Sequence, residues 1–293
     1  MGENPATAPR ALLAQVRTLA QTMARTFAQT MVLAVATALA LSGPAQAQLD
    51  PSPESGAGNY ANCMDMASRN PEQAFEFAGR WEGLGGGDAA RHCAAAALIN
   101  LGELAEGATR LEALAEPAGL AREIRIGLLA QAGRAWMQLP DRERAVASLT
   151  SAIQLANPGP ETVLPALPGL LPDLYLDRAV VLADAGDIPA TLNDLNAALA
   201  LEPGRQEALI LRATARRLLG NLPGALADAD LVVRSFPQDP EGLLERGAVH
   251  AAMGNTDAAR ADWRQVLAVD PDPNGPWRAK AQDNLARLEL SPP

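Results

Sequence analysis

Three consecutive segments of 34 residues, 172–205, 206–239 and 240–273, carry the same pattern of residue types. A glycine stands near the middle of each segment and a proline near its end. These two columns are Gly186, Gly220, Gly254 and Pro203, Pro237, Pro271. A fixed period of about 20–50 residues is typical of an array built by stacking one small unit on the next. The repeat therefore predicts a stacked array in this part of the chain.

Each segment predicts a pair of antiparallel helices. In the first half, apolar residues recur at helical spacing, and the glycine that follows can close the last turn in the left-handed conformation. Asp187, Asn221 and Asn255 come next and are good N-cap residues for a second helix. The proline near the end cannot continue that helix. A column of small residues lets the two helices approach closely. It consists of Ala179, Ala213 and Gly247.

This hairpin resembles the tetratricopeptide repeat (TPR). The matching columns are a large apolar residue, the small residue four positions later, the turn glycine, an alanine early in the second helix and the closing proline. The large apolar column is Tyr175, Leu209 and Leu243, and the alanines are Ala225 and Ala259. The first repeat departs from the pattern with Thr191, and Arg216 and His250 replace a large apolar residue. The resemblance implies an all-α, right-handed superhelical solenoid of helical hairpins whose first helices line a concave, protein-binding face.

Residues 1–47 predict a secretory signal peptide. Three arginines precede the apolar run Met31–Leu41, and small residues follow at Ala45 and Ala47. The run is shorter than the roughly 20 residues of an ordinary membrane span, although a retained anchor is the alternative. Translation from Met23 instead of Met1 would give a signal of more usual length. We expect cleavage after Ala47, a periplasmic location and no membrane anchor after cleavage.

The rest of the chain divides around the three repeats. Residues 48–58 predict a disordered tail, and 59–157 predict three degenerate TPR-like hairpins. Their expected helices are 59–70, 71–84, 88–102, 103–116, 126–139 and 142–156. Residues 158–171 form a proline-rich connection, which is a boundary between two sub-arrays, a loop with its own role or an inserted connection packed by its leucines. Residues 274–293 predict a C-terminal capping helix.

Charge and chemistry argue against several functions. The net charge is −10, and loss of residues 1–47 would remove three arginines and one glutamate, so binding to nucleic acid is not expected. The two histidines, His92 and His250, have no carboxylate at a spacing that suggests acid–base catalysis. The run 83–88 lacks the Lys-Ser/Thr of a phosphate-binding loop and predicts a turn ending in the N-cap Asp88. We therefore expect no enzyme activity, no cofactor and no metal.

The two cysteines predict a disulfide. An even number of cysteines in an exported protein is usually paired. If the degenerate hairpins stack, Cys63 and Cys93 lie in neighbouring first helices. Free buried thiols are the main alternative. A metal site with His92 would lack a fourth ligand.

The repeated columns give candidate binding residues. The resemblance places nine first-helix residues on the concave face as a mostly apolar groove: Leu176, Val180, Ala183, Ile210, Thr214, Arg217, Leu244, Ala248 and Ala251. They do not match the Lys/Asn/Arg clamp of TPR proteins that bind chaperone tails. The alternative is that the superhelix covers them or that they are merely solvated. An acidic residue stands at the start of each first helix, namely Asp173, Glu207 and Glu241. This acidic row has two interpretations: it complements the helix dipole, or it recognises a basic ligand.

Two charged columns share the 34-residue register and predict ion pairs within each repeat. The pairs are Arg178 with Asp194, Arg212 with Asp228, and Arg246 with Asp262. Together these features predict a periplasmic scaffold or adaptor that binds a protein or peptide through its concave groove. The alternative is a structural or self-associating envelope component without a separate peptide ligand.

Overall fold

The structure, a computed structural model, describes residues 56–290 apart from 118, 158–168, 271 and 273. The predicted signal peptide, most of the predicted tail and most of the proline-rich connection therefore lie outside the described residues. Helices are the only regular elements in the described ranges. They form two compact units, and the chain passes from one to the other between Ala185 and Gly186. We call them the N-terminal unit and the C-terminal unit. This division lies beyond the connection 158–171 and inside the first 34-residue repeat.

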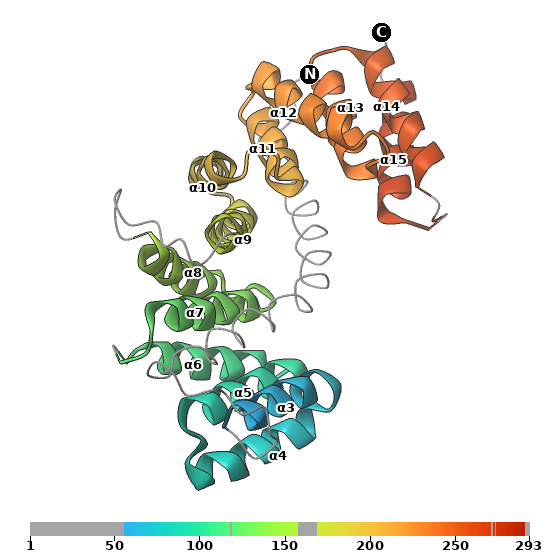
Figure 1. The fold of residues 1–293 in the computed structure, drawn as a ribbon. Coiled ribbons are helices and arrows are strands. Elements are labelled where there is room, and N and C mark those ends of the chain that lie inside the picture. The colour runs from blue at the N-terminus through green and yellow to red at the C-terminus, as the bar shows by residue number, and fades with distance from the viewer. Residues whose placement is uncertain (1–55, 118, 158–168, 271, 273, 291–293) are drawn as a thin grey trace. The chain divides into compact units, whose positions relative to one another are not determined.

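The N-terminal unit is a stack of helical hairpins in chain order (Figure 1). Its elements are α3 (Gly56–Arg69), α4 (Pro71–Trp81), the π-helical turn η1 (Glu82–Gly86), α5 (Gly87–Leu101), α6 (Leu104–Ala115), α7 (Arg122–Met137), α8 (Arg142–Ala156) and α9 (Leu170–Ala185). Each helix packs against the next along most of this series. The three hairpins predicted over 59–157 are therefore present, as α3–α4, α5–α6 and α7–α8.

Two predictions at the start of this unit are wrong in detail. Helix α3 begins at Gly56, so the last three residues of the predicted tail 48–58 are helical. Asp88 does not cap α5, because that helix begins at Gly87 and follows directly on η1. The chain turns there through left-handed glycines, Gly85 with φ 94° and Gly87 with φ 54°, which only glycine adopts without strain. Asp88 instead forms an ion pair with Arg91 at 3.0 Å.

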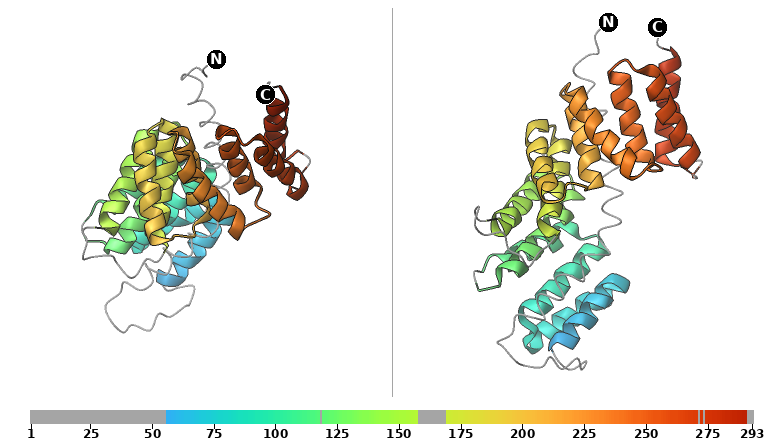
Figure 2. Two further views of the ribbon diagram at one scale, coloured as in Figure 1. Left: turned by 90° about the horizontal axis from the view of Figure 1, so that it is seen from above. Right: turned by 45° about the horizontal axis from the view of Figure 1, so that its top comes forward.

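The C-terminal unit follows the 34-residue period closely. Its helices are α10 (Ile188–Leu201), α11 (Gln206–Leu218), α12 (Leu222–Ser235), α13 (Pro240–Ala252), α14 (Thr256–Val269) and α15 (Pro276–Leu290), which stack in that order (Figure 2). The turn glycines Gly186, Gly220 and Gly254 have φ between 76° and 83°, as expected for helix C-caps. Asp187 and Asn221 accept backbone N–H bonds as N-caps.

Close helix contacts explain the small-residue column. A Cβ atom on Gly247 would lie 2.5 Å from the indole nitrogen of Trp263, so α13 and α14 can pack this tightly only because residue 247 has no side chain. Trp263 is buried with Val266 in the last core cluster, and Trp277 of α15 packs against that cluster. Helix α15 therefore covers apolar surface at the end of the stack.

Candidate protein-binding face

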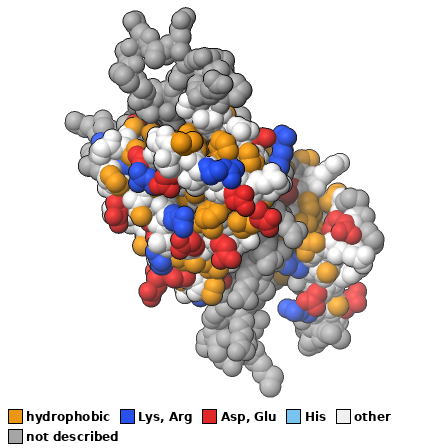
Figure 3. Space-filling view, turned by 90° about the horizontal axis from the view of Figure 1, so that it is seen from below, with side chains coloured by type: hydrophobic (Ala, Val, Ile, Leu, Met, Phe, Trp, Pro, Cys, Tyr) orange, Lys and Arg blue, Asp and Glu red, His pale blue; other side chains and the backbone are white. Residues whose placement is uncertain are grey.

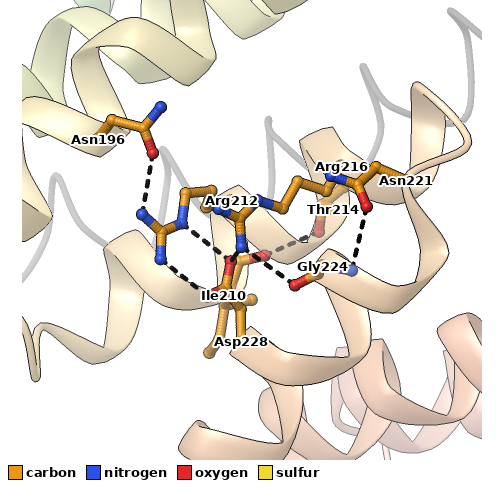
Figure 4. Close-up of polar contacts among 8 residues, drawn as sticks. All are labelled: Asn196, Ile210, Arg212, Thr214, Arg216, Asn221, Gly224 and Asp228. Atoms are coloured by element: carbon orange, nitrogen blue, oxygen red, sulfur yellow. Dashed lines mark hydrogen bonds and ion pairs between the residues drawn. The ribbon is translucent and has the colours of Figure 1, made fainter.

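A buried carboxylate organises the polar contacts of the second repeat. Arg212 makes a two-pronged bond to Asp228, with Nη2–Oδ1 at 2.8 Å and Nε–Oδ2 at 2.9 Å (Figure 4). Arg216 adds a third bond to Asp228 at 2.7 Å and donates to the carbonyl of Gly224. Arg216 is one of the departures from the TPR pattern. It stands in an apolar column because its charge helps to neutralise Asp228, which is only 4% exposed.

The third repeat has the same pair. Arg246 bonds Asp262 through Nη2–Oδ1 at 2.6 Å and Nε–Oδ2 at 3.0 Å. Two of the three predicted pairs are therefore formed within the C-terminal unit. The residues of the third, Arg178 and Asp194, belong to different units. Within the N-terminal unit, Arg178 donates to Thr150 at 3.0 Å.

Each arginine of this column also reaches the preceding hairpin. The acceptors are Thr150 for Arg178, Asn196 for Arg212 (2.9 Å) and Asp230 for Arg246 (3.3 Å). Each acceptor stands one residue after a buried residue of its second helix, namely Leu149, Leu195 or Ala229. In the second and third repeats the column therefore ties the hairpin internally and to the preceding second helix, which holds these hairpins in register.

The first helices α11 and α13 are neighbours in the C-terminal unit and present one side, which we call the first-helix face. Arg217 of α11 bonds Glu245 of α13 through Nε–Oε1 at 2.8 Å and Nη2–Oε2 at 3.2 Å. Glu245 is 3% exposed. The sequence reasoning missed Glu245, since its column holds Asp177 and Leu211 in the other repeats. The only sequence feature that could have indicated this ion pair is the charge of Glu245 in a column whose residue type varies from repeat to repeat.

Glu241 is the electrostatic outlier of this face. Burial, and to a smaller extent the nearby charge of Asp239, raise its pKa from the ordinary 4.5 to about 8, whereas Lys280 acts in the opposite direction. Burial in turn lowers the pKa of Lys280, whose ammonium lies 4.8 Å from the centre of the Trp277 ring. The face therefore holds a half-buried carboxyl group with a strong preference for its neutral form.

The predicted groove residues are mostly inaccessible. In the C-terminal unit, Ile210, Thr214 and Leu244 are buried, whereas Arg217, Ala248 and Ala251 remain partly exposed. In the N-terminal unit, Leu176, Val180 and Ala183 are buried. An open apolar strip at all nine positions is therefore not confirmed. On the accessible part of the C-terminal unit's first-helix face, small apolar side chains lie beside charged ones.

The three residues of the acidic row, Asp173, Glu207 and Glu241, differ in their contacts, and two of them lie near arginines. Arg134 of α7 forms ion pairs with two carboxylates of α9. Its Nη2 lies 3.9 Å from Asp173 Oδ2, and its Nε lies 2.6 Å from Asp177 Oδ2. These contacts tie α7 to α9, two first helices of the N-terminal unit. Glu207 accepts from Arg205 at 3.1 Å. In these two cases the carboxylates stabilise the array locally.

The N-terminal unit has the predicted disulfide. Cys63 of α3 and Cys93 of α5 are bonded, with their Cα atoms 6.0 Å apart. Beside it, a buried polar chain links three first helices. The Tyr60 hydroxyl donates to His92 Nδ1 at 2.7 Å, and His92 Nε2 donates to Gln131 Oε1 at 3.1 Å. Burial lowers the pKa of His92, so the imidazole is held neutral in the folded chain.

The described ranges contain no group of three or more His, Cys, Asp or Glu side chains placed to hold a metal ion. None of the helices described is both long and apolar enough to cross a membrane. On the face drawn in Figure 3, acidic side chains are interspersed with arginines and apolar residues.

No protein-family model and no curated protein matches the chain. Solved structures do. One is the structure of YrrB, described as a TPR protein with an unusual peptide-binding site. It is 18% identical, and the match covers 67% of this chain and 90% of that one with a TM-score of 0.52. MamA from Desulfovibrio magneticus RS-1 is also 18% identical, over 62% of this chain and 93% of that one, with a TM-score of 0.51. At this identity the likeness concerns the fold.

Proposed function

From its tetratricopeptide-repeat fold, we propose that this chain is a scaffold that binds a protein or peptide partner. The observation that carries the proposal is the construction of the first-helix face. Arg217–Glu245 fixes the first helices α11 and α13 against each other, and Arg246–Asp230 fixes α13 to the second helix α12, so the face is held in place before a ligand arrives. A rigid face loses less conformational entropy on binding than a flexible one.

The accessible groups of this face in the C-terminal unit suggest the type of contact. Ala248 and Ala251 are small and partly exposed, so the backbone of a partner segment can approach α13 closely. Arg217 and Glu241 flank them with polar groups that can orient the segment. Such a surface suits an extended or helical peptide with apolar residues toward the alanines.

We place this activity in the periplasm, after removal of residues 1–47. The proposal rests on the arginines, the apolar run and the small residues before Gln48. Mass spectrometry of the protein recovered from periplasm should find an N-terminus at Gln48. Recovery of the intact N-terminus from the membrane fraction would favour a retained anchor instead.

Affinity purification from periplasm tests the scaffold. We expect a distinct protein to co-purify with the wild-type chain and to be lost from the variant Ala248→Arg/Ala251→Arg, which blocks the first-helix face. The matched control is Ala261→Arg/Ala268→Arg, because both alanines are exposed on the second helix α14. Recovery of self-oligomers alone would favour a self-associating envelope component. Equal loss in both variants would contradict the assignment of the face.

A further inference from the structure

A cleft of about 340 Å³ opens in the N-terminal unit, where α6 ends, α7 begins and α8 makes its last turns. It is lined by Glu112, Ala115, Glu116, Arg125, Leu129, Ser151, Gln154 and Leu155. None of these residues belongs to the predicted groove or to the Tyr60–His92–Gln131 chain. Arg125 and Leu129 come from the first helix α7, and the other lining residues come from the second helices α6 and α8 or the residue after α6. The cleft is distinct from the first-helix face proposed above, because that face belongs to α11 and α13 of the C-terminal unit.

The floor of the cleft is an apolar side chain that packs against the core but stays partly exposed. Leu129 precedes the small residue Gly133 by four positions, as Leu209 precedes Ala213 and Leu243 precedes Gly247. Leu209 and Leu243 are 3% and 2% exposed, whereas Leu129 is only partly buried. Leu155 from α8 lies beside it in the lining. The cleft therefore exposes to a ligand part of an apolar side chain whose counterparts in the second and third repeats are buried in the core.

The carboxylate of Glu112, on the α6 wall, is already fully engaged. Its Oε1 accepts from Trp136 Nε1 at 2.8 Å and from the Ser148 hydroxyl at 2.6 Å, and its Oε2 accepts from Arg144 Nη2 at 2.6 Å. The Arg144 guanidinium also lies over the Trp136 ring, 4.0 Å from its centre. Glu112 therefore brings no unneutralised charge to the cleft.

Arg125 is the cation of this cleft that lacks a carboxylate. Its Nε donates to the Ala115 carbonyl at 2.7 Å, which fixes the plane of the guanidinium at the end of α6. Its terminal nitrogens have no hydrogen bond or ion pair with any residue that the structure describes. By contrast, the half-buried Arg212, Arg217 and Arg246 each bond a carboxylate. The two terminal NH2 groups of Arg125 are therefore available to a ligand, in a chain whose net charge is −10.

Two further donors stand on the α8 wall. Ser151 and Gln154 are exposed and line the cleft opposite Arg125. A guanidinium recognises a carboxylate with two parallel hydrogen bonds, and a hydroxyl or amide N–H can add a third. Glu116 stands at the exposed rim and repels a second negative charge, so the cleft suits one carboxylate and not a run of them.

We propose that this cleft is a second docking site, which takes an apolar side chain of a partner segment on Leu129 and Leu155 and a neighbouring Asp or Glu side chain on Arg125. Its size lies at the lower end of ligand pockets, which span roughly 300–1,000 Å³, so it holds two side chains and not a folded surface. The site is independent of the first-helix face.

Fluorescence anisotropy with labelled, acetylated and amidated hexapeptides tests the site on the full chain. The probes carry a central Leu-Glu, Leu-Gln or Ala-Glu pair in an otherwise Gly-Ser sequence. We expect the Leu-Glu peptide to bind at least tenfold more tightly than either of the others. Equal binding of Leu-Glu and Leu-Gln, or no binding at all, would overturn the proposal. Tighter binding of a peptide ending in a free Leu carboxylate would overturn the choice of a carboxylate side chain.

Variants locate the binding. Arg125→Gln should remove the preference for Leu-Glu over Leu-Gln, and Arg122→Gln, on the exposed first turn of the same helix, should keep it. Because Arg125 also holds the end of α6, a second variant leaves that bond intact. Leu129→Trp fills the floor and should weaken Leu-Glu binding at least tenfold. Binding that survives both Arg125→Gln and Leu129→Trp would show that the peptide docks elsewhere.

Discussion

The variant Glu241→Gln should stabilise the C-terminal unit at alkaline pH and have little effect at acidic pH. Glu241 has an ordinary pKa of 4.5 when unfolded and a pKa of about 8 in the folded chain, chiefly because it is buried and also because Asp239 lies nearby. Between these two values the folded state holds a proton that the unfolded state has lost. Stability therefore falls as the pH rises from about 4.5 to about 8, and stays low above that.

The two pKa values bound the size of the effect. One pKa unit corresponds to about 1.4 kcal/mol, so the difference between 4.5 and about 8 sets an upper limit of about 5 kcal/mol. The side chain keeps partial exposure and can turn toward water, which lowers the cost of its charge. We therefore expect Glu241→Gln to raise the free energy of unfolding by about 1–3 kcal/mol at pH 9, since glutamine has the shape of the acid without the charge.

Urea unfolding at pH 5 and pH 9 measures this difference. The control is Asp257→Asn, because Asp257 is exposed and paired with Arg260. This variant should change stability by less than about 1 kcal/mol at either pH. The same stabilisation by Glu241→Gln at both pH values would mean that charge is not the cause. A loss of stability at pH 9 would refute the reasoning outright.

Three further predictions concern other contacts. Stability of the N-terminal unit should fall as the pH drops below about 6.5, because His92 then binds a proton in the unfolded state but stays neutral in the folded state, where burial lowers its pKa. His92→Gln should reduce this pH dependence in urea unfolding. Arg264→Asp should raise the melting temperature by giving Lys280 an acceptor, whereas Arg264→Gln should raise it less. Thiol titration of unreduced, denatured protein should find no free thiol, and replacing Cys63 and Cys93 by alanine should cost about 3 kcal/mol.

Local signals predicted the hairpins well where the repeat is strict. The turn glycines Gly220 and Gly254 and the N-cap Asn221 fixed helix ends in residues 206–273, because each acts through its own local conformation. Asn255 precedes α14 as predicted, but its side chain makes no cap bond. The prediction failed at 83–88, where glycines let the chain continue as a π-helical turn and α5 starts without a side-chain cap. Glycine permits several such conformations, and composition alone does not choose among them.

The candidate face was harder to predict. Periodicity shows which residues share a side of a helix, and it correctly paired Arg212 with Asp228 and Arg246 with Asp262. It does not show what covers that side, so the sequence could not choose between an open groove and burial of residues such as Ile210. The same holds for contacts between different columns. Arg217–Glu245 and the cleft at Arg125 depend on how neighbouring hairpins sit, which no single repeat encodes.

The arginine column also explains why the junction between α14 and α15 is built differently from the earlier ones. At each earlier junction the arginine meets an uncharged or negative acceptor on the preceding second helix, namely Thr150, Asn196 or Asp230. The next position in that series is Arg264, and the next donor is Lys280. Two positive charges cannot form the tie, and Lys280 lies over Trp277 instead. Helix α15 is held differently, by Arg278 bonding the carbonyls at the end of α14. The column that sets the register thus loses its acceptor at the junction between α14 and α15.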